Sequence, residues 1–219
     1  MDMQEAIGAI RALSVEEVSE KLARESIGSV RSELLLDVIN GRVPLSYIPA
    51  LDIQLFAIKA LRRDLYDALP DRGHPYASWE LYEYDPAKNG KNIIKHGVGF
   101  HEVASLSSNF GTLSVAYPHS DDEDRVVIFS NLNSGDNARN LDLPYPHIDG
   151  LVYVMTIAQQ MPELRYRFIS SRIIDQDDYR RHMTQAFRDI PVNTQDEKRL
   201  KKDFVDVCEG ILKRNMFWQ

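Results

Sequence analysis

The feature that most constrains the fold is a change of hydrophobic period across residues 70–75. This stretch reads Pro-Asp-Arg-Gly-His-Pro and is rich in residues that interrupt helices and strands. Before it, six apolar residues recur at helical spacing between positions 51 and 69, which indicates an amphipathic helix. After it, apolar and acidic residues interleave over 79–84, which indicates an extended segment. The sequence therefore predicts a helical N-terminal module, residues 1–72, followed by a second unit.

Three helices are expected in the N-terminal module. Ser14 and Glu17 have the spacing of a capping box, so one helix begins there. A second is expected at about 29–40, where Gly41 suits a left-handed stop. The third begins near Pro49 and ends at Pro70.

The second unit, residues 73–187, mixes helices and strands. Asp85 and Pro86 form a typical helix start, and Gly97 a typical stop, so a helix is expected over 86–96 with a short one at 100–106. Segments enriched in β-branched or aromatic residues predict strands at 111–117, 125–130, 151–157 and 164–170. An Asn-, Asp-, Pro- and Gly-rich stretch at 133–149 predicts an inserted surface loop. Helices are expected at 176–187 and, within residues 188–219, from Thr194 to the end, so the fold class is α+β.

Charge and composition exclude several classes of protein. The 219 residues carry 26 basic and 33 acidic side chains, and a net charge of −7 argues against a surface that attracts nucleic acid as a whole, although a local basic cleft fits. One cysteine cannot form an internal disulfide, and the longest apolar stretches are too short to span a bilayer. The acidic opening lacks the features of a signal peptide, so we expect a cytoplasmic protein with no membrane partner. Scattered histidines and the lack of zinc and nucleotide motifs predict no metal and no cofactor.

Three motifs occur in a characteristic order. Residues 83–104 read EYDPAKNGKNIIKHGVGFHEVA, residues 124–127 read DRVV, and residues 167–172 read RFISSR, with Tyr179 beyond them. Together they resemble the signature of the BrnT family of toxins, small ribonucleases of type II toxin–antitoxin pairs, over about residues 79–183. Residues 1–72, the 133–149 loop and the C-terminal helix are additions to the single domain of that family.

The resemblance implies an α+β fold of the RelE/ParE kind, in which an antiparallel sheet with packed helices presents a basic concave face to RNA. It also implies metal-independent cleavage of cytoplasmic RNA by an endoribonuclease, and a protein antitoxin that covers the site.

Metal-free RNA cleavage sets requirements of its own. The neighbouring 2′-hydroxyl attacks the phosphorus, so the site needs a base for its proton, cations for the extra charge and an acid for the departing 5′-oxygen. We expect Arg125 and Arg172 to stabilise the phosphate, His96 to transfer a proton, and Lys95 to contact the phosphate or position a proton partner. Candidate contacts to the RNA are Lys88, Lys91 and Arg167.

Each candidate also has a structural interpretation. The three lysines fit a solvated helix face, and His96 could bond the last carbonyls of its helix. Arg125 could pair with the acidic run 121–124, and Arg172 with Asp175. His119, His147 and His182 are expected at the surface or in turns.

Two other functions fit the same sequence. The acidic charge and the added segments fit a non-catalytic protein-interaction module that keeps the fold. Alternatively, the N-terminal helices lie over the site of a toxin as a built-in inhibitor. A homo-oligomer also fits the sequence.

Overall fold

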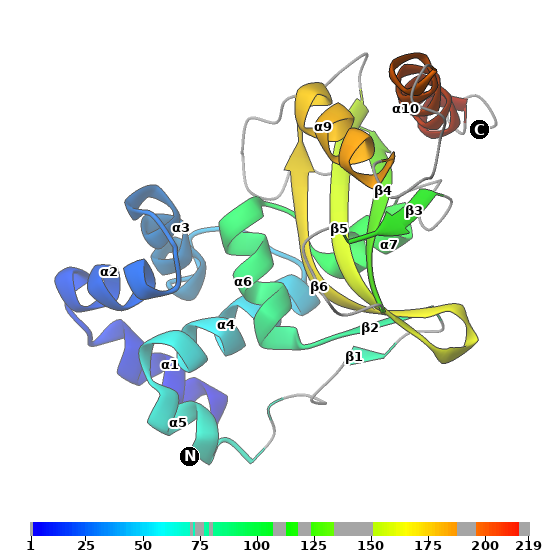
Figure 1. Ribbon diagram of the computed structural model, residues 1–219. Helices are drawn as coiled ribbons and strands as arrows, with labels where there is room; N and C mark the ends of the chain where they lie inside the picture. Colours follow the sequence, from blue (N-terminus) through cyan, green and yellow to red (C-terminus); the bar gives the residue numbers. More distant parts are fainter. Residues whose placement is uncertain are drawn as a thin grey trace.

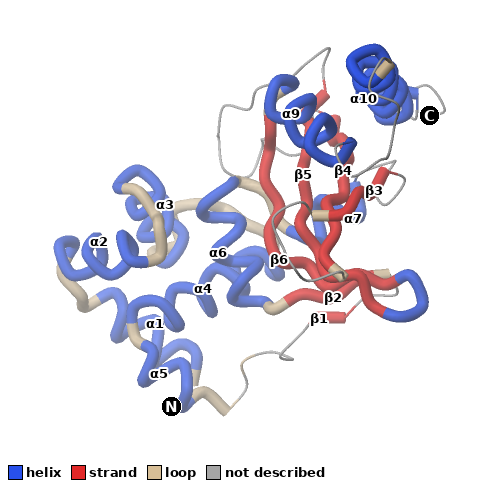
Figure 2. Tube along the Cα trace, in the orientation of Figure 1, coloured by secondary structure: helices blue, strands red, loops and turns tan. Residues whose placement is uncertain are grey.

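The computed structural model describes residues 2–70, 72, 77–78, 81–106, 113–117, 124–133, 151–187 and 196–214. A group of N-terminal helices lies on one side of a twisted sheet, and helix α6 lies between them (Figure 1). Of the two C-terminal helices, the one over residues 176–187 lies against one end of the sheet, and the one over residues 197–214 lies farther from the N-terminal group (Figure 2). Within the described residues, no helix is both long and apolar enough to cross a bilayer.

The N-terminal helices are α1 (Met3–Arg11), α2 (Val15–Arg24), α3 (Ser29–Ile39), α4 (Tyr47–Leu61) and α5 (Arg63–Ala68). The capping box of Ser14 and Glu17 is formed, and Gly41 has the left-handed φ of 71°. The expected third helix is interrupted at Arg62, whose φ of −140° and ψ of 69° are not helical. The Arg62 side chain bonds Asp64 there, which a pattern of apolar residues does not reveal.

The helices after residue 85 begin where the sequence predicts them, except that the last begins at Glu197 and not directly after Thr194. Helix α6 (Pro86–His96) is capped by the Asp85 side chain and ends at Gly97, whose φ is 79°. It is followed by α7 (Phe100–Leu106), and the later helices are α9 (Gln176–Phe187) and α10 (Glu197–Arg214). The α+β class and the C-terminal helix are therefore confirmed.

The strands form one six-stranded mixed sheet in the order β1 (Ala77–Ser78), β2 (Tyr82–Tyr84), β6 (Arg165–Ile174), β5 (Leu151–Met161), β4 (Arg125–Asn133), β3 (Leu113–Ala116). The expectation of a purely antiparallel sheet is wrong, because β2 pairs with β6 in parallel. Strands β5 and β6 form an antiparallel hairpin, whereas β2 is joined to β6 through the whole intervening chain, and a long crossover permits parallel pairing. Residues 134–150, which hold most of the expected loop, lie outside the described residues, as do 111–112 and 121–123.

Apolar side chains cover both faces of the sheet. One face packs against α7 through Tyr82, Tyr84, Phe100, Ile128, Ala158 and Phe168. The other packs against α9 and α10 through Val127, Phe129, Tyr153, Met155, Tyr179, Met183, Val205 and Cys208. Helix α6 packs into a third core, because Ala87, Ile93 and Ile94 are buried among the apolar residues of the N-terminal helices. The N-terminal helices therefore share a hydrophobic core with α6 of the second unit.

Helices α4 and α6 approach each other closely at Gly90. A Cβ atom at this position would lie 2.0 Å from the backbone oxygen of Asp52, so only glycine permits the contact. Beside it, the buried Asn89 donates from Nδ2 to Asp52 Oδ2 at 2.7 Å and accepts the backbone N–H of Phe100 at 2.7 Å. One amide thus joins α4, α6 and the start of α7.

The pKa of Asp52 is raised from 3.8 to about 7, chiefly by burial. The hydrogen bond from Asn89 lowers the pKa in part, and the negative charge of Asp85 raises it a little more. Between pH 3.8 and 7 the folded chain therefore binds more protons at this carboxyl than the unfolded chain. The contribution of Asp52 to stability accordingly falls as the pH rises through that range.

We expect Asp52→Asn to be more stable than the wild type at pH 8, by on the order of 4 kcal/mol, because the amide oxygen still accepts from Asn89 without a buried charge. At pH 4 the advantage should vanish, since both side chains are then neutral in the fold. Urea unfolding at the two pH values measures this, with the exposed Asp203→Asn as control. Destabilisation by Asp52→Asn of the same size at both pH values would contradict the account.

Candidate functional site

Strand β6 has an edge that β2 covers only in part. The β2 pairing reaches Tyr166 and Arg167 and leaves the later part of the strand beside α6. There the buried amide of Asn92 takes the role of a neighbouring strand: Nδ2 donates to the Ser171 carbonyl at 2.8 Å, and Oδ1 accepts the Ser171 N–H at 2.9 Å. Nδ2 also donates to the Val98 carbonyl at 2.8 Å. These bonds hold the C-terminal end of α6 beside the residue that precedes Arg172.

A pocket of about 260 Å³ lies where the end of α6 meets the sheet. We call it the α6–β6 pocket, and its lining residues are Lys95, His96, Tyr117, Met155, Ile157, Ser170, Arg172 and His182. Met155 and Ile157 supply an apolar wall, while every other lining residue can form hydrogen bonds. Such a combination suits an anion that needs both orientation and exclusion of water.

Arg172 projects from β6 toward α9. Its Nη2 lies 3.1 Å from His182 Nε2. A guanidinium can only donate, so Nε2 is the acceptor and the neutral His182 ring carries its proton on Nδ1. Arg172 Nε is buried and has no hydrogen-bond partner among the described residues. A buried donor of this kind is stabilised by an acceptor such as a phosphate oxygen, which a guanidinium binds with two parallel bonds.

His96 is the last residue of α6. Its pKa is lowered from 6.5 to about 4, chiefly by burial and to a smaller extent by the positive charges of Lys95, Arg172, Arg31 and Lys91. The imidazole is therefore neutral at pH 7 and can accept a proton. Within the described part of the chain its ring makes no hydrogen bond to a helix carbonyl, so the capping interpretation gains no support.

The structure brings three of the four predicted catalytic residues together, Lys95, His96 and Arg172. Arg125 does not line the α6–β6 pocket. It begins β4 opposite Gln159, which pairs with Arg167. Arg125 is thus two strands away from β6 and lies across the sheet from Arg167. Arg172 is five residues farther along β6, which is about 16 Å at ~3.3 Å per residue. The acidic residues 121–123, its alternative partners, lie outside the described residues.

The predicted substrate contacts lie apart from the α6–β6 pocket. Arg167 Nε donates to Oε1 of the buried Glu83 at 2.5 Å, and Lys91 Nζ pairs with Glu25 of α2 at 2.7 Å. Lys88 is exposed near the start of α6, about 10 Å along the helix from Lys95 at 1.5 Å per residue. Two of these three cations therefore already neutralise carboxylates of the chain.

Sequence reasoning missed His182 and Arg31. His182 was expected at the surface, but it contacts Arg172 across the packing of α9 on β6. Arg31, on α3, adds to the positive potential at His96. Neither carries a local sequence signal, because both depend on contacts between distant elements.

Comparison with known proteins identifies no relative: the chain matches no protein-family model, no curated protein and no solved structure. Among the residues that the structure describes, no group of three His, Cys, Asp or Glu side chains is placed to hold a metal ion. The chemically distinctive feature of the described chain is therefore the set of cations and imidazoles in the α6–β6 pocket.

We expect Lys95→Gln to raise the pKa of His96 above its value of about 4, because one of the positive charges beside the ring is removed. Burial should still hold the pKa below 6.5. Histidine NMR signals followed against pH measure this, and the exposed Lys88→Gln is the matched control, expected to leave His96 unchanged. A wild-type His96 that titrates at 6.5 would show that the ring is not in this environment.

Proposed function

We propose that this chain is a metal-independent ribonuclease of the BrnT kind, with a RelE/ParE-like domain extended by the N-terminal helices and α10. The observation that carries the proposal is a neutral imidazole, His96, in one pocket with the cations of Lys95 and Arg172. A base and charge stabilisation are two of the three functions that cleavage by the neighbouring 2′-hydroxyl demands.

The cations act on the phosphate. During attack the phosphorus becomes five-coordinate and its oxygens gain negative charge. Arg172 and Lys95 both line the α6–β6 pocket and place two positive charges beside these oxygens. An interaction lowers the barrier when it is stronger in the transition state, where the phosphate oxygens carry more negative charge. An interaction of equal strength in the ground state and the transition state does not.

His96 moves the proton of the nucleophile. It accepts the proton of the 2′-hydroxyl as the 2′-oxygen bonds to phosphorus and the bond to the 5′-oxygen breaks, which leaves a 2′,3′-cyclic phosphate and a 5′-hydroxyl. A pKa of about 4 makes the ring a weak base in the free protein. Bound phosphate offsets the charges of Lys95 and Arg172 that lower this pKa, so substrate itself makes His96 more basic. Water gives the departing 5′-oxygen its proton, because a neutral His182 that accepts from Arg172 at Nε2 cannot act as an acid.

The described lining of the α6–β6 pocket bears on one of the alternatives. It includes no Asp or Glu, but residues 121–123 and 134–149, which hold most of the candidate blocking acids, lie outside the described residues. None of its described lining residues belongs to the N-terminal helices, so covering by those helices is less favoured. A protein antitoxin that occludes this pocket belongs to the same proposal.

We expect Arg172→Ala to reduce cleavage of single-stranded RNA at least 100-fold, the usual effect of removing one donor to a developing oxyanion. The assay contains EDTA and compares the wild type, Arg172→Lys, which keeps the charge, and Arg24→Ala, an exposed arginine of α2, as control. Thermal unfolding shows that each variant is folded. Cleavage by folded Arg172→Ala at the wild-type rate would refute the proposal.

A further inference from the structure

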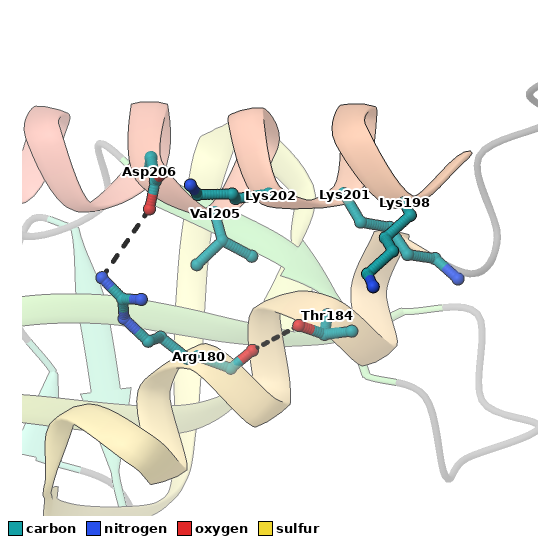
Figure 3. Close-up of a pocket in the computed structure, with 7 residues that line it drawn as sticks. All are labelled: Arg180, Thr184, Lys198, Lys201, Lys202, Val205 and Asp206. Carbon is teal, nitrogen blue, oxygen red and sulfur yellow. Dashed lines mark hydrogen bonds and ion pairs between the residues drawn. The ribbon is translucent and has the colours of Figure 1, made fainter. Parts of the chain in front are cut away.

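A second concave surface lies between the two C-terminal helices. It has a volume of about 310 Å³ and we call it the α9–α10 groove. Figure 3 shows Arg180 and Thr184 projecting from α9 toward α10, with Val205 between the helices. The wall from α10 carries Lys198, Lys201, Lys202 and Asp206. Four of its seven lining residues are therefore cationic and one is acidic.

The cations of the α9–α10 groove differ in how far they are neutralised. Arg180 pairs with Glu209 at 2.9 Å and with Asp206 at 3.7 Å, and Lys201 pairs with Glu197. Lys198 and Lys202 are exposed and make no ion pair or hydrogen bond to another described residue. These two lysines are therefore the groups in the groove that can neutralise an external anion.

Helix α9 connects the α9–α10 groove to the α6–β6 pocket. Its buried residues, Tyr179, Met183 and Phe187, face the sheet and α10. With 3.6 residues per turn, His182 lies on one side of this stripe and Arg180 on the other. His182 lines the α6–β6 pocket and Arg180 lines the groove, so the two sites flank one helix. Arg181, exposed on the outer surface, lies between them.

We propose that the α9–α10 groove binds the backbone of single-stranded RNA that extends from the α6–β6 pocket. This inference rests on the proposed ribonuclease function and names where the substrate continues. An α-helix with its side chains is about 10–12 Å across. A single strand that leaves the α6–β6 pocket crosses this width within a few nucleotides. Phosphates beyond that point would meet Lys198 and Lys202.

Charge favours an extended polyanion over a single small anion here. Arg180 and Lys201 are held by carboxylates of the chain, so a lone phosphate would gain little from them. A strand anchored at Arg172 brings its next phosphates to the groove without a second loss of translational freedom, and weak contacts then add to affinity. Contacts to phosphate also carry no sequence information, so the groove sets affinity and length preference rather than base preference.

Binding of deoxyoligonucleotides tests the inference, because they carry the phosphates and lack the 2′-hydroxyl needed for cleavage. Fluorescence anisotropy gives Kd for a dinucleotide and a 12-mer at several salt concentrations. We expect Lys198→Ala/Lys202→Ala to weaken the 12-mer about tenfold and to lower the salt slope by about 1.4, at ~0.7 per phosphate contact on a single strand. The dinucleotide, whose one phosphodiester lies in the α6–β6 pocket, should weaken less than twofold.

The matched control is Arg199→Ala/Arg24→Ala, which removes the same total charge from exposed sites outside the groove. An unchanged 12-mer Kd for the lysine pair, or an equal loss in the control, would overturn the inference. If wild-type protein cleaves no RNA but the lysine pair still weakens the 12-mer selectively, the ribonuclease proposal fails while the groove stands as a site for single-stranded nucleic acid. If the wild-type protein cleaves RNA but 12-mer binding does not depend on the two lysines, the ribonuclease proposal stands and the inference about the groove fails.

Discussion

The amide of Asn92 takes the place of a strand beside β6, and the candidate site depends on that contact. Both backbone groups of Ser171 are satisfied by one side chain, so α6 can lie against an edge that β2 leaves open. Unsatisfied edge groups in a buried position would each cost about 1–3 kcal/mol. The same contact brings the end of α6, with Lys95 and His96, to the strand that carries Arg172. The same hydrogen bonds therefore cover the edge of β6 and bring the residues of the site together.

The N-terminal helices support α6 from its other side. Gly90 lets the backbone of α4 approach closely, and Asn89 links Asp52 to the start of α7. Helix α6 is therefore held between two partners, the sheet through Asn92 and the N-terminal helices through Asn89. A disturbance of the N-terminal core should displace Lys95 and His96 even though no described residue of those helices lines the α6–β6 pocket. This arrangement gives the added helices a structural role in the function we propose.

Local signals in the sequence predicted the elements that depend on local chemistry. The bounds of α6 followed from Asp85, Pro86 and Gly97, because caps act within one turn. Pairing across the sheet did not follow: nothing in residues 82–84 reveals that β2 runs parallel to β6. Arg125 illustrates the consequence for the site. Its place at the start of a strand was predicted correctly. Its position across the sheet from Arg167 and not from Arg172 depends on the register of β4, β5 and β6, which is set by long-range pairing.

The central claim is that the α6–β6 pocket is built to receive a phosphodiester between Arg172 and the imidazoles. The most direct measurement is an NMR titration with a deoxydinucleotide, which carries one phosphodiester and cannot be cleaved through a 2′-hydroxyl, while the ring signals of His96 and His182 are followed against pH. The account predicts that both signals shift on saturation and that the pKa of His96 rises from about 4 as the phosphate offsets the neighbouring cations. Saturable binding that leaves both rings and the pKa of His96 unchanged would place the phosphate elsewhere and contradict the account.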